Sequence, residues 1–218
     1  MPFERNRPAQ PMSRRRKNGV LVFCLLGLAM LVLLDRSTVR YRWPYRVETV
    51  TPSPANDLEK YYGESFLVVK VIDGDTLDID VPDGRYDHTR IRLLGIDAPE
   101  TGSGQSPAMY FGPQATERAR ELALGKPVEV YLDSPNLTRG KYGRLLTYVK
   151  LPDGRFLNEV LLSEGYAYAD RRFRHSFSNK YRQLEAAARN SRSGLWQNVT
   201  RDQLPEWLQR MEPTLLTE

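Results

Sequence analysis

Alternating apolar and polar positions predict three consecutive β-strands in the middle of the chain, over residues 65–72, 77–81 and 89–96. Side chains of a strand point alternately to its two faces, so this pattern is typical of strands with one buried face. Asp, Gly and Pro residues that favour turns separate the strands at positions 73–75 and 82–84. We therefore expect three strands joined by tight turns.

The second half of the chain contains two further apolar runs, at residues 128–132 and 145–150, that predict strands. Helix-forming residues near Gly or Pro predict helices over residues 112–124, 157–164 and 177–190. Short strands combined with these helices indicate an α+β protein that is mainly β. We expect a closed or partly open barrel of the oligonucleotide-binding (OB-fold) type that carries helices.

Fifteen uncharged apolar residues, 20–34, follow a basic cluster and predict a membrane-directed helix. Spanning helices usually need about 20 such residues, whereas the core of a secretory signal needs roughly 7 to 15. Because no small-x-small cleavage site follows Leu34, we expect an uncleaved single-pass signal anchor, with secretion after signal cleavage as the alternative. The positive-inside rule places residues 1–19 in the cytoplasm and the rest of the chain on the extracytoplasmic side, although four arginines between residues 36 and 46 oppose that orientation.

The length of 218 residues suffices for one domain of ordinary size with appendages. We expect this folded domain over residues 64–198. The segments before it are predicted to be a basic tail (1–19), the anchor (20–34) and a stalk (35–63). An amphipathic tail is expected to follow it, over residues 199–218.

The net charge of +5 belongs to the amino terminus, because residues 1–19 hold six basic and one acidic residue. Residues 48–218 hold 22 basic and 25 acidic residues and have a net charge of −3. If the domain handles nucleic acid, local arginines or a bound cation must attract it, since no domain-wide positive field exists. The single cysteine, Cys24, excludes an intramolecular disulfide and a cysteine-rich zinc site.

Charged residues gather in three clusters, at residues 72–76, 92–101 and 138–144. Each cluster alone is a weak signal, because an Asp-Gly-Asp sequence often only caps a turn. Together they hold the carboxylates and arginines that phosphodiester hydrolysis requires. They therefore point to a hydrolytic site for nucleic acid.

Each of these side chains has a plausible role in such a site. Asp75 and Asp97 offer hard oxygen ligands for calcium or magnesium, and Glu100 could orient or deprotonate a water molecule. Arg92 and Arg144 could hold phosphate oxygens and stabilise the charge of the transition state. The alternative is that both arginines form purely structural salt bridges with the carboxylates.

Residues from about 66 to 196 resemble the staphylococcal nuclease-like (thermonuclease) family, of which this chain looks like a membrane-anchored member. The resemblance rests on ordered blocks with the family's approximate spacing, which is far more specific than one short motif. These blocks are residues 69–76, 92–101, 141–144, 157–159 together with Gly165, and 194–196.

The resemblance implies a calcium-dependent endonuclease that hydrolyses DNA, RNA or both on a five-stranded OB-fold barrel with three helices. By position, Asp75 and Asp97 match the family's Ca2+ carboxylates, and the backbone carbonyl of Ala98 matches a further ligand. Glu100 matches the family's general base. The remaining matches are the two catalytic arginines, Arg92 and Arg144, and two residues that contact the nucleotide phosphate, Lys141 and Tyr142.

Two other functions are compatible with the same fold. A non-catalytic module that binds nucleic acid or protein would be expected to lack a catalytic side chain, and none is lost here. A membrane-tethered scaffold would use Trp207 and Leu208 of the tail to dock on a partner or on the bilayer. No protein partner is inferred, a monomer is expected, and the phosphate chemistry does not discriminate DNA from RNA.

Overall fold

The computed structural model describes residues 53–102, 107–133 and 137–216. The expected basic tail and anchor, residues 1–34, and most of the expected stalk lie outside these residues. Within the described ranges, none of the helices combines the length and the apolar character needed to cross a membrane.

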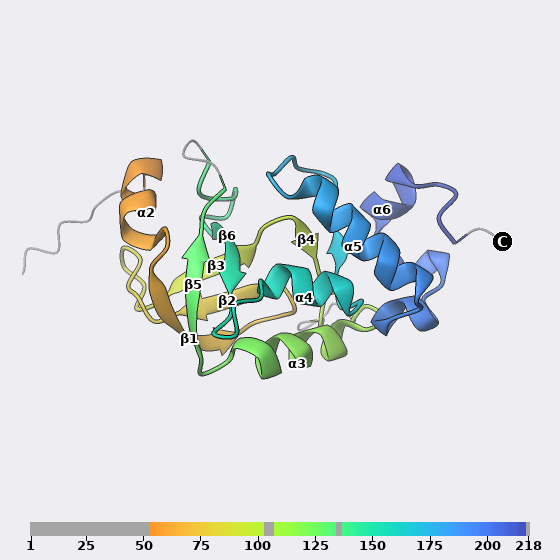
Figure 1. Cartoon of the computed structure of the whole chain (residues 1–218), viewed down its shortest axis with the longest axis horizontal. Coiled ribbons are helices and arrows are strands. Elements are labelled where there is room, and N and C mark those ends of the chain that lie inside the picture. The colour runs from red at the N-terminus through yellow and green to blue at the C-terminus, as the bar shows by residue number, and fades with distance from the viewer. Residues whose placement is uncertain (1–52, 103–106, 134–136, 217–218) are drawn as a thin grey trace, which may run out of the picture. The chain divides into compact units, whose positions relative to one another are not determined.

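Five strands close into a barrel in the order β1-β2-β3-β6-β5, which confirms the expected mainly β fold with a five-stranded barrel (Figure 1). The pairing of β3 with β6 is parallel, and the other pairings within the barrel are antiparallel. The strands are β1 (Ser65–Val71), β2 (Thr76–Ile79), β3 (Thr89–Leu93), β5 (Pro127–Tyr131) and β6 (Leu145–Lys150).

The interior of the barrel is filled by the apolar positions of the alternating pattern. Each strand contributes at least one side chain with 1% exposure or less: Val68, Leu77, Ile91, Val130 and Val149. Burial of such side chains is the main favourable contribution to folding, at about 1.5–3 kcal/mol for each large aliphatic group. The pattern that predicts the strands is therefore also the pattern that stabilises the barrel.

Three helices lie where the sequence predicts them: α3 (Gly112–Ala123), α4 (Leu157–Ser163) and α5 (Ser178–Asn190). Helix α4 packs against both α3 and α5 and lies between them (Figure 1). Helices α3 and α4 also contact the barrel, at β1 and β6, whereas α5 contacts β7 of the small sheet.

The third predicted strand, residues 89–96, is divided in two by the structure. Gly95 has a φ of 77°, a left-handed conformation that interrupts a strand and that glycine adopts without steric cost. The chain then forms β4 (Ile96–Asp97), which pairs with β7 (Tyr168–Ala169) in a separate two-stranded sheet. Asp97 therefore lies on this small sheet and not at the end of a barrel strand.

The folded part of the chain begins before the expected boundary at residue 64, because residues 54–61 form a helix and are not part of a stalk. In helix α2 (Pro54–Tyr61), the Tyr61 side chain is fully buried, and its hydroxyl lies 3.0 Å from Thr89 Oγ1. Asp57 is also buried, and its Oδ1 lies 2.7 Å from Arg139 Nη2. Tyr61, Leu58 and the polar contacts of Asp57 attach the helix, and this short segment shows no long apolar periodicity in the sequence.

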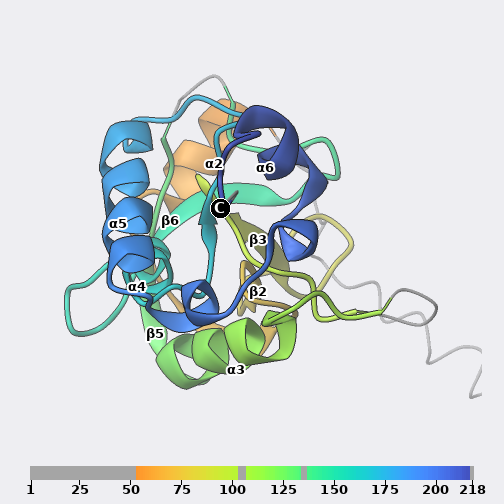
Figure 2. The same ribbon diagram turned by 90° about the vertical axis from the view of Figure 1, so that its right-hand side faces the viewer.

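The expected carboxy-terminal tail is also packed into the domain. After α5 the chain forms two short 3-10 helices, η1 (Gly194–Gln197) and η2 (Arg201–Gln203), and returns along the domain to α6 (Glu206–Met211) (Figure 2). Trp207 and Leu208 are buried against Trp196 in a second apolar cluster. These two side chains therefore face the interior and do not form the docking surface that the scaffold interpretation requires.

Replacing Asp57 by Ala is predicted to lower the free energy of unfolding by about 3 kcal/mol, because it leaves Arg139 without one partner of a buried ion pair. This loss is at the low end of the range for breaking a buried ion pair, because Arg139 keeps a second partner. Its Nη1 lies 2.6 Å from Asp83 Oδ2. Urea denaturation of the full chain measures the effect.

The matched control is Asp153→Ala, which removes an exposed carboxylate that pairs with the exposed Arg155 and should change stability little. Equal effects of the two substitutions would show that α2 is not an integral part of the domain.

Candidate active site

A tight turn between β1 and β2 brings Asp75 to the site. The Asp75 amide donates a hydrogen bond to Asp73 Oδ1 at 3.0 Å, which closes the turn with a side chain. Gly74 packs directly on the segment after β4, where a Cβ atom at position 74 would lie only 2.6 Å from Ala98 Cβ. A larger residue at position 74 would push the turn away from Ala98, so glycine is required here.

The Asp75 carboxylate is buried, with 5% of the residue exposed, and hydrogen-bonded at both oxygens. Its Oδ2 accepts a hydrogen bond from the Ala98 amide at 2.7 Å and forms an ion pair with Arg92 Nη1, also at 2.7 Å. Its Oδ1 accepts one from Thr76 Oγ1 at 3.1 Å. Burial raises the pKa of Asp75 to about 8, against the opposing effect of Arg92, so positive charge nearby is needed to keep this carboxylate ionised.

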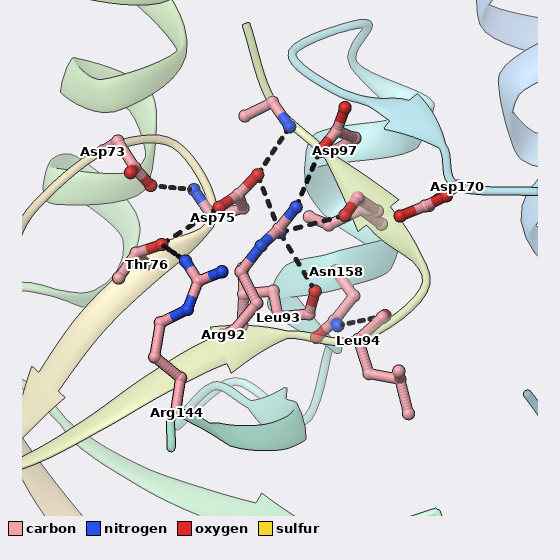
Figure 3. Close-up of polar contacts among 12 residues, drawn as sticks. Asp73, Asp75, Thr76, Arg92, Leu93, Leu94, Asp97, Arg144, Asn158 and Asp170 are labelled. Atoms are coloured by element: carbon pink, nitrogen blue, oxygen red, sulfur yellow. Dashed lines mark hydrogen bonds and ion pairs between the residues drawn. The ribbon is translucent and has the colours of Figure 1, made fainter. Parts of the chain in front are cut away.

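Arg92, on β3, lies between the two aspartates (Figure 3). Its Nη1 contacts Asp75, and its Nη2 lies 2.7 Å from Asp97 Oδ1. Nη1 also donates to the carbonyl of Ile96 at 2.9 Å, and only 13% of the side chain is exposed. Arg92 therefore bridges both carboxylates, as the structural alternative expects for this residue.

Arg144, just before β6, differs from Arg92 because it pairs with no carboxylate in the part of the chain that the structure describes. Its Nη1 donates a hydrogen bond to Thr76 Oγ1 at 3.3 Å, which directs the guanidinium toward the Asp75 turn (Figure 3). The structural alternative thus fails for Arg144. Its charge remains available for an anion such as a phosphate group.

Glu100 follows β4 and is exposed, and its side chain forms no hydrogen bond or ion pair with another described residue. Loss of hydration raises the pKa of Glu100, and the negative charges of Asp73 and Asp97 raise it further. The positive charges of Arg92 and Arg144 act in the opposite direction. Glu100 therefore belongs electrostatically to the same cluster and has a carboxylate free to accept a proton.

The start of α3 fixes the backbone of Glu100. The Met109 amide donates to the Glu100 carbonyl at 2.9 Å. A Cβ atom at position 112 would lie 2.1 Å from the same carbonyl oxygen, so Gly112 permits this close approach. The position of Glu100 thus depends on a helix that begins more than ten residues later.

Lys141 and Tyr142 lie beside Arg144 in an exposed loop. Lys141 Nζ is 4.6 Å from the centre of the Tyr142 ring, and Tyr142 is 71% exposed. Arg139, from the same basic cluster, instead holds the loop by donating to the Gly143 carbonyl at 3.0 Å. The sequence cluster therefore divides into Arg139, which has a structural role, the partly buried Arg144, and the exposed Lys141 and Tyr142.

The donors that could hold a metal ion are oxygens. Among the described residues, no three His, Cys, Asp or Glu side chains are grouped as a metal site. Two carboxylates, those of Asp75 and Asp97, lie on either side of Arg92, and further ligands would have to be backbone oxygens or water. Such a donor set fits calcium or magnesium and does not fit zinc.

Two residues outside the predicted site also contact Asp97. Trp207 Nε1 donates to Asp97 Oδ2 at 2.7 Å, and Arg172 Nη2 lies 2.9 Å from Asp97 Oδ1. Trp207 is 110 positions away from Asp97 in the sequence. No local pattern connects residues so far apart, so this contact could not be predicted from the sequence.

Comparison with known proteins shows which family the sequence resembles. A sequence model of the family described as staphylococcal nuclease homologue matches residues 90–198. A thermonuclease of Staphylococcus intermedius is 37% identical over 139 residues, which cover 62% of this chain and 77% of the relative. An uncharacterized endonuclease of Escherichia coli O157:H7 is 34% identical over 143 residues, covering 66% and 82%. A micrococcal nuclease of Shigella flexneri is 30% identical over 148 residues, covering 64% and 78%.

The family match spans half of the chain and includes Arg92, Asp97, Glu100 and Arg144. The relatives are named as nucleases, and the aligned residues cover more than three quarters of each. The chain therefore belongs to the staphylococcal nuclease family and is a nuclease, an enzyme that hydrolyses phosphodiester bonds.

Proposed function

We propose that the protein is a calcium-dependent endonuclease that cleaves DNA, RNA or both. The observation that carries the proposal is the guanidinium of Arg144, which pairs with no carboxylate among the described residues, points to the Asp75 turn through Thr76 and interacts electrostatically with Glu100. An unpaired arginine next to a free carboxylate combines an anion-binding group with a potential base. This combination suits attack of water on a phosphodiester.

Glu100 acts as the general base in this proposal. The groups around it raise its pKa, and a more basic carboxylate accepts a proton from water more readily. Its side chain is not engaged with another described residue, so it can reach a water molecule without breaking an existing contact. Water held by Glu100 would attack phosphorus from the side opposite the leaving oxygen.

Arg144 and Arg92 stabilise the negative charge of the transition state, but to different extents. Arg144 binds a phosphate oxygen directly, since within residues 53–102, 107–133 and 137–216 no carboxylate has to release it first. Arg92 is already shared between Asp75 and Asp97, so it also has a structural task. Lys141 and Tyr142 extend the same surface and contact the phosphate of a bound nucleotide.

Asp75, Asp97 and the carbonyl of Ala98 are proposed to hold the calcium ion. The Ala98 amide bonds to Asp75, which keeps the backbone of Ala98 adjacent to that carboxylate. When bound, calcium would neutralise charge on a phosphoryl oxygen. The side chains themselves supply the oxygen ligands, the base and the cationic groups.

The amino-terminal segment, residues 20–34, is proposed to anchor the enzyme in a membrane as an uncleaved helix, with the nuclease domain on the extracytoplasmic side. The proposal rests on the uncharged run and the basic residues before it.

Replacing Arg144 by Ala should lower kcat by about 100-fold or more, as expected for the loss of one charged donor to the transition state. The melting temperature should hardly change, because Arg144 is not part of an ion pair with a described carboxylate.

Glu100→Gln should reduce kcat by about 100-fold or more, because the substitution removes the proposed general base. Arg155→Ala, which removes an exposed arginine from the turn after β6, serves as the control.

A folded Arg144→Ala protein with normal turnover would contradict the role assigned to Arg144. Arg92→Ala is expected to differ from Arg144→Ala by destabilising the protein as well, since it removes the Arg92 ion pair from Asp75 and leaves Asp97 with Arg172 alone as an ion-pair partner.

Cleavage of single-stranded DNA, duplex DNA and RNA by the purified protein should require calcium and stop when a chelator is added. The relative rates on the three substrates would establish the preference that the phosphate chemistry leaves open. Undiminished cleavage with the chelator would refute the calcium dependence while leaving the nuclease assignment intact.

Fractionation of bacterial cells that express the full chain should leave the protein in the membrane pellet after alkaline carbonate washing. Deleting residues 1–34 should move it to the soluble fraction. A shortened, soluble protein in the culture medium would instead indicate secretion after signal cleavage.

A further inference from the structure

The carboxy-terminal segment reaches the candidate active site through the side chain of Trp207. The indole Nε1 donates a hydrogen bond to Asp97 Oδ2 at 2.7 Å. The other oxygen, Oδ1, contacts Arg92 at 2.7 Å and Arg172 at 2.9 Å. Both oxygens of Asp97 are therefore held, and Trp207 holds the one that the arginines do not contact.

The Trp207 ring is itself fixed on both sides. It is 8% exposed, and it packs in the second apolar cluster with Leu204 and Trp196. The guanidinium of Arg172 lies 4.7 Å from the ring centre, within the range of a cation–π contact. The indole N–H is thus presented to Asp97 by a packed environment and not by an exposed side chain that can rotate away.

Arginine side chains attach α6 and the residues after it to the domain. Arg201 Nη2 donates to the carbonyl of Gln209 at 3.2 Å, and its Nη1 donates to the carbonyls of Glu212 and Leu215. Arg171 also pairs with the Glu212 side chain. These contacts keep α6 in place, so Trp207 is oriented toward Asp97 before any ligand binds.

Trp207 lies outside residues 90–198, the part of the chain that the family model matches, whereas its partner Asp97 lies inside it. The segment that follows the matched residues therefore adds the contact between Trp207 and Asp97 to the site.

We infer that Trp207 is a positioning residue, which orients the Asp97 carboxylate for calcium, and this inference rests on the proposed function. A carboxylate held only through Oδ1 can rotate about its Cβ–Cγ bond, whereas a donor on Oδ2 fixes its plane. Each carboxylate oxygen has two lone pairs, so the single hydrogen bond from Trp207 leaves Oδ2 able to bind a cation. Hydrogen bonds to ligating carboxylates commonly strengthen metal binding in this way.

The test is Trp207→Phe in the full chain, with calcium affinity measured by isothermal titration calorimetry. Phenylalanine keeps an aromatic ring for the cluster and for Arg172 but lacks the N–H donor. The expected result is about tenfold weaker calcium binding, the lower end for loss of such a supporting hydrogen bond, with a nearly unchanged melting temperature.

Trp196→Phe is the matched control because it removes the same N–H group from the same cluster. Trp196 is 6% exposed, and its Nε1 is buried without a hydrogen-bond partner among the described residues. This variant should bind calcium as the parent protein does. In the parent protein labelled with 15N-tryptophan, calcium should shift the Trp207 indole resonance more than that of Trp196.

Three outcomes would overturn the inference, and they are distinguishable. Unchanged calcium affinity in Trp207→Phe would show that the hydrogen bond does not orient the ligand. Tighter binding in that variant would show that Trp207 competes with the ion for Asp97. Absence of calcium binding by the parent protein would remove the proposed calcium dependence together with this role of Trp207.

Discussion

The shared ion pair of Arg92 with Asp75 and Asp97 is the interaction on which the rest of the site depends. Two carboxylates with little solvent access repel each other and lose hydration, so their proximity requires a positive charge between them. Arg92 supplies that charge, and its hydrogen bond to the Ile96 carbonyl also holds the turn at Gly95. Removing one partner from such a buried pair typically costs about 3–5 kcal/mol.

The barrel brings the members of this pair together from separate parts of the chain. Thr76, directly after Asp75, lies opposite Arg92 in the pairing of β2 with β3. On the other side, Arg92 pairs with Leu146 of β6, two residues after Arg144. The buried Asn158 of α4 donates to the Leu94 carbonyl at 3.0 Å and so fixes the turn that leads to Asp97 (Figure 3). The closed sheet therefore places Asp75 and both arginines together, and the turn held by Asn158 adds Asp97 from the small sheet.

Local sequence patterns are enough to predict the strands of the barrel and to select the candidate site residues, because both depend on short segments. The period-two alternation of the strands and the Asp-Gly-Asp turn are each contained within a few residues. Strands β4 and β7 have two residues each and are too short to show a period. The contacts that distinguish structural from available charge, such as Asp57 with Arg139 and Trp207 with Asp97, connect residues 82 and 110 positions apart. They depend on tertiary packing, so the separate roles of Arg92 and Arg144 could not be read from the sequence.

The most direct test of the account is a crystal structure of the enzyme with calcium and a non-hydrolysable nucleotide phosphate, in which anomalous scattering locates the ion. The account predicts an ion bound by Asp75 and Asp97, with Arg144 on the phosphate and Glu100 facing the phosphorus atom. An ion bound elsewhere, or a phosphate that Arg144 does not contact, would contradict it.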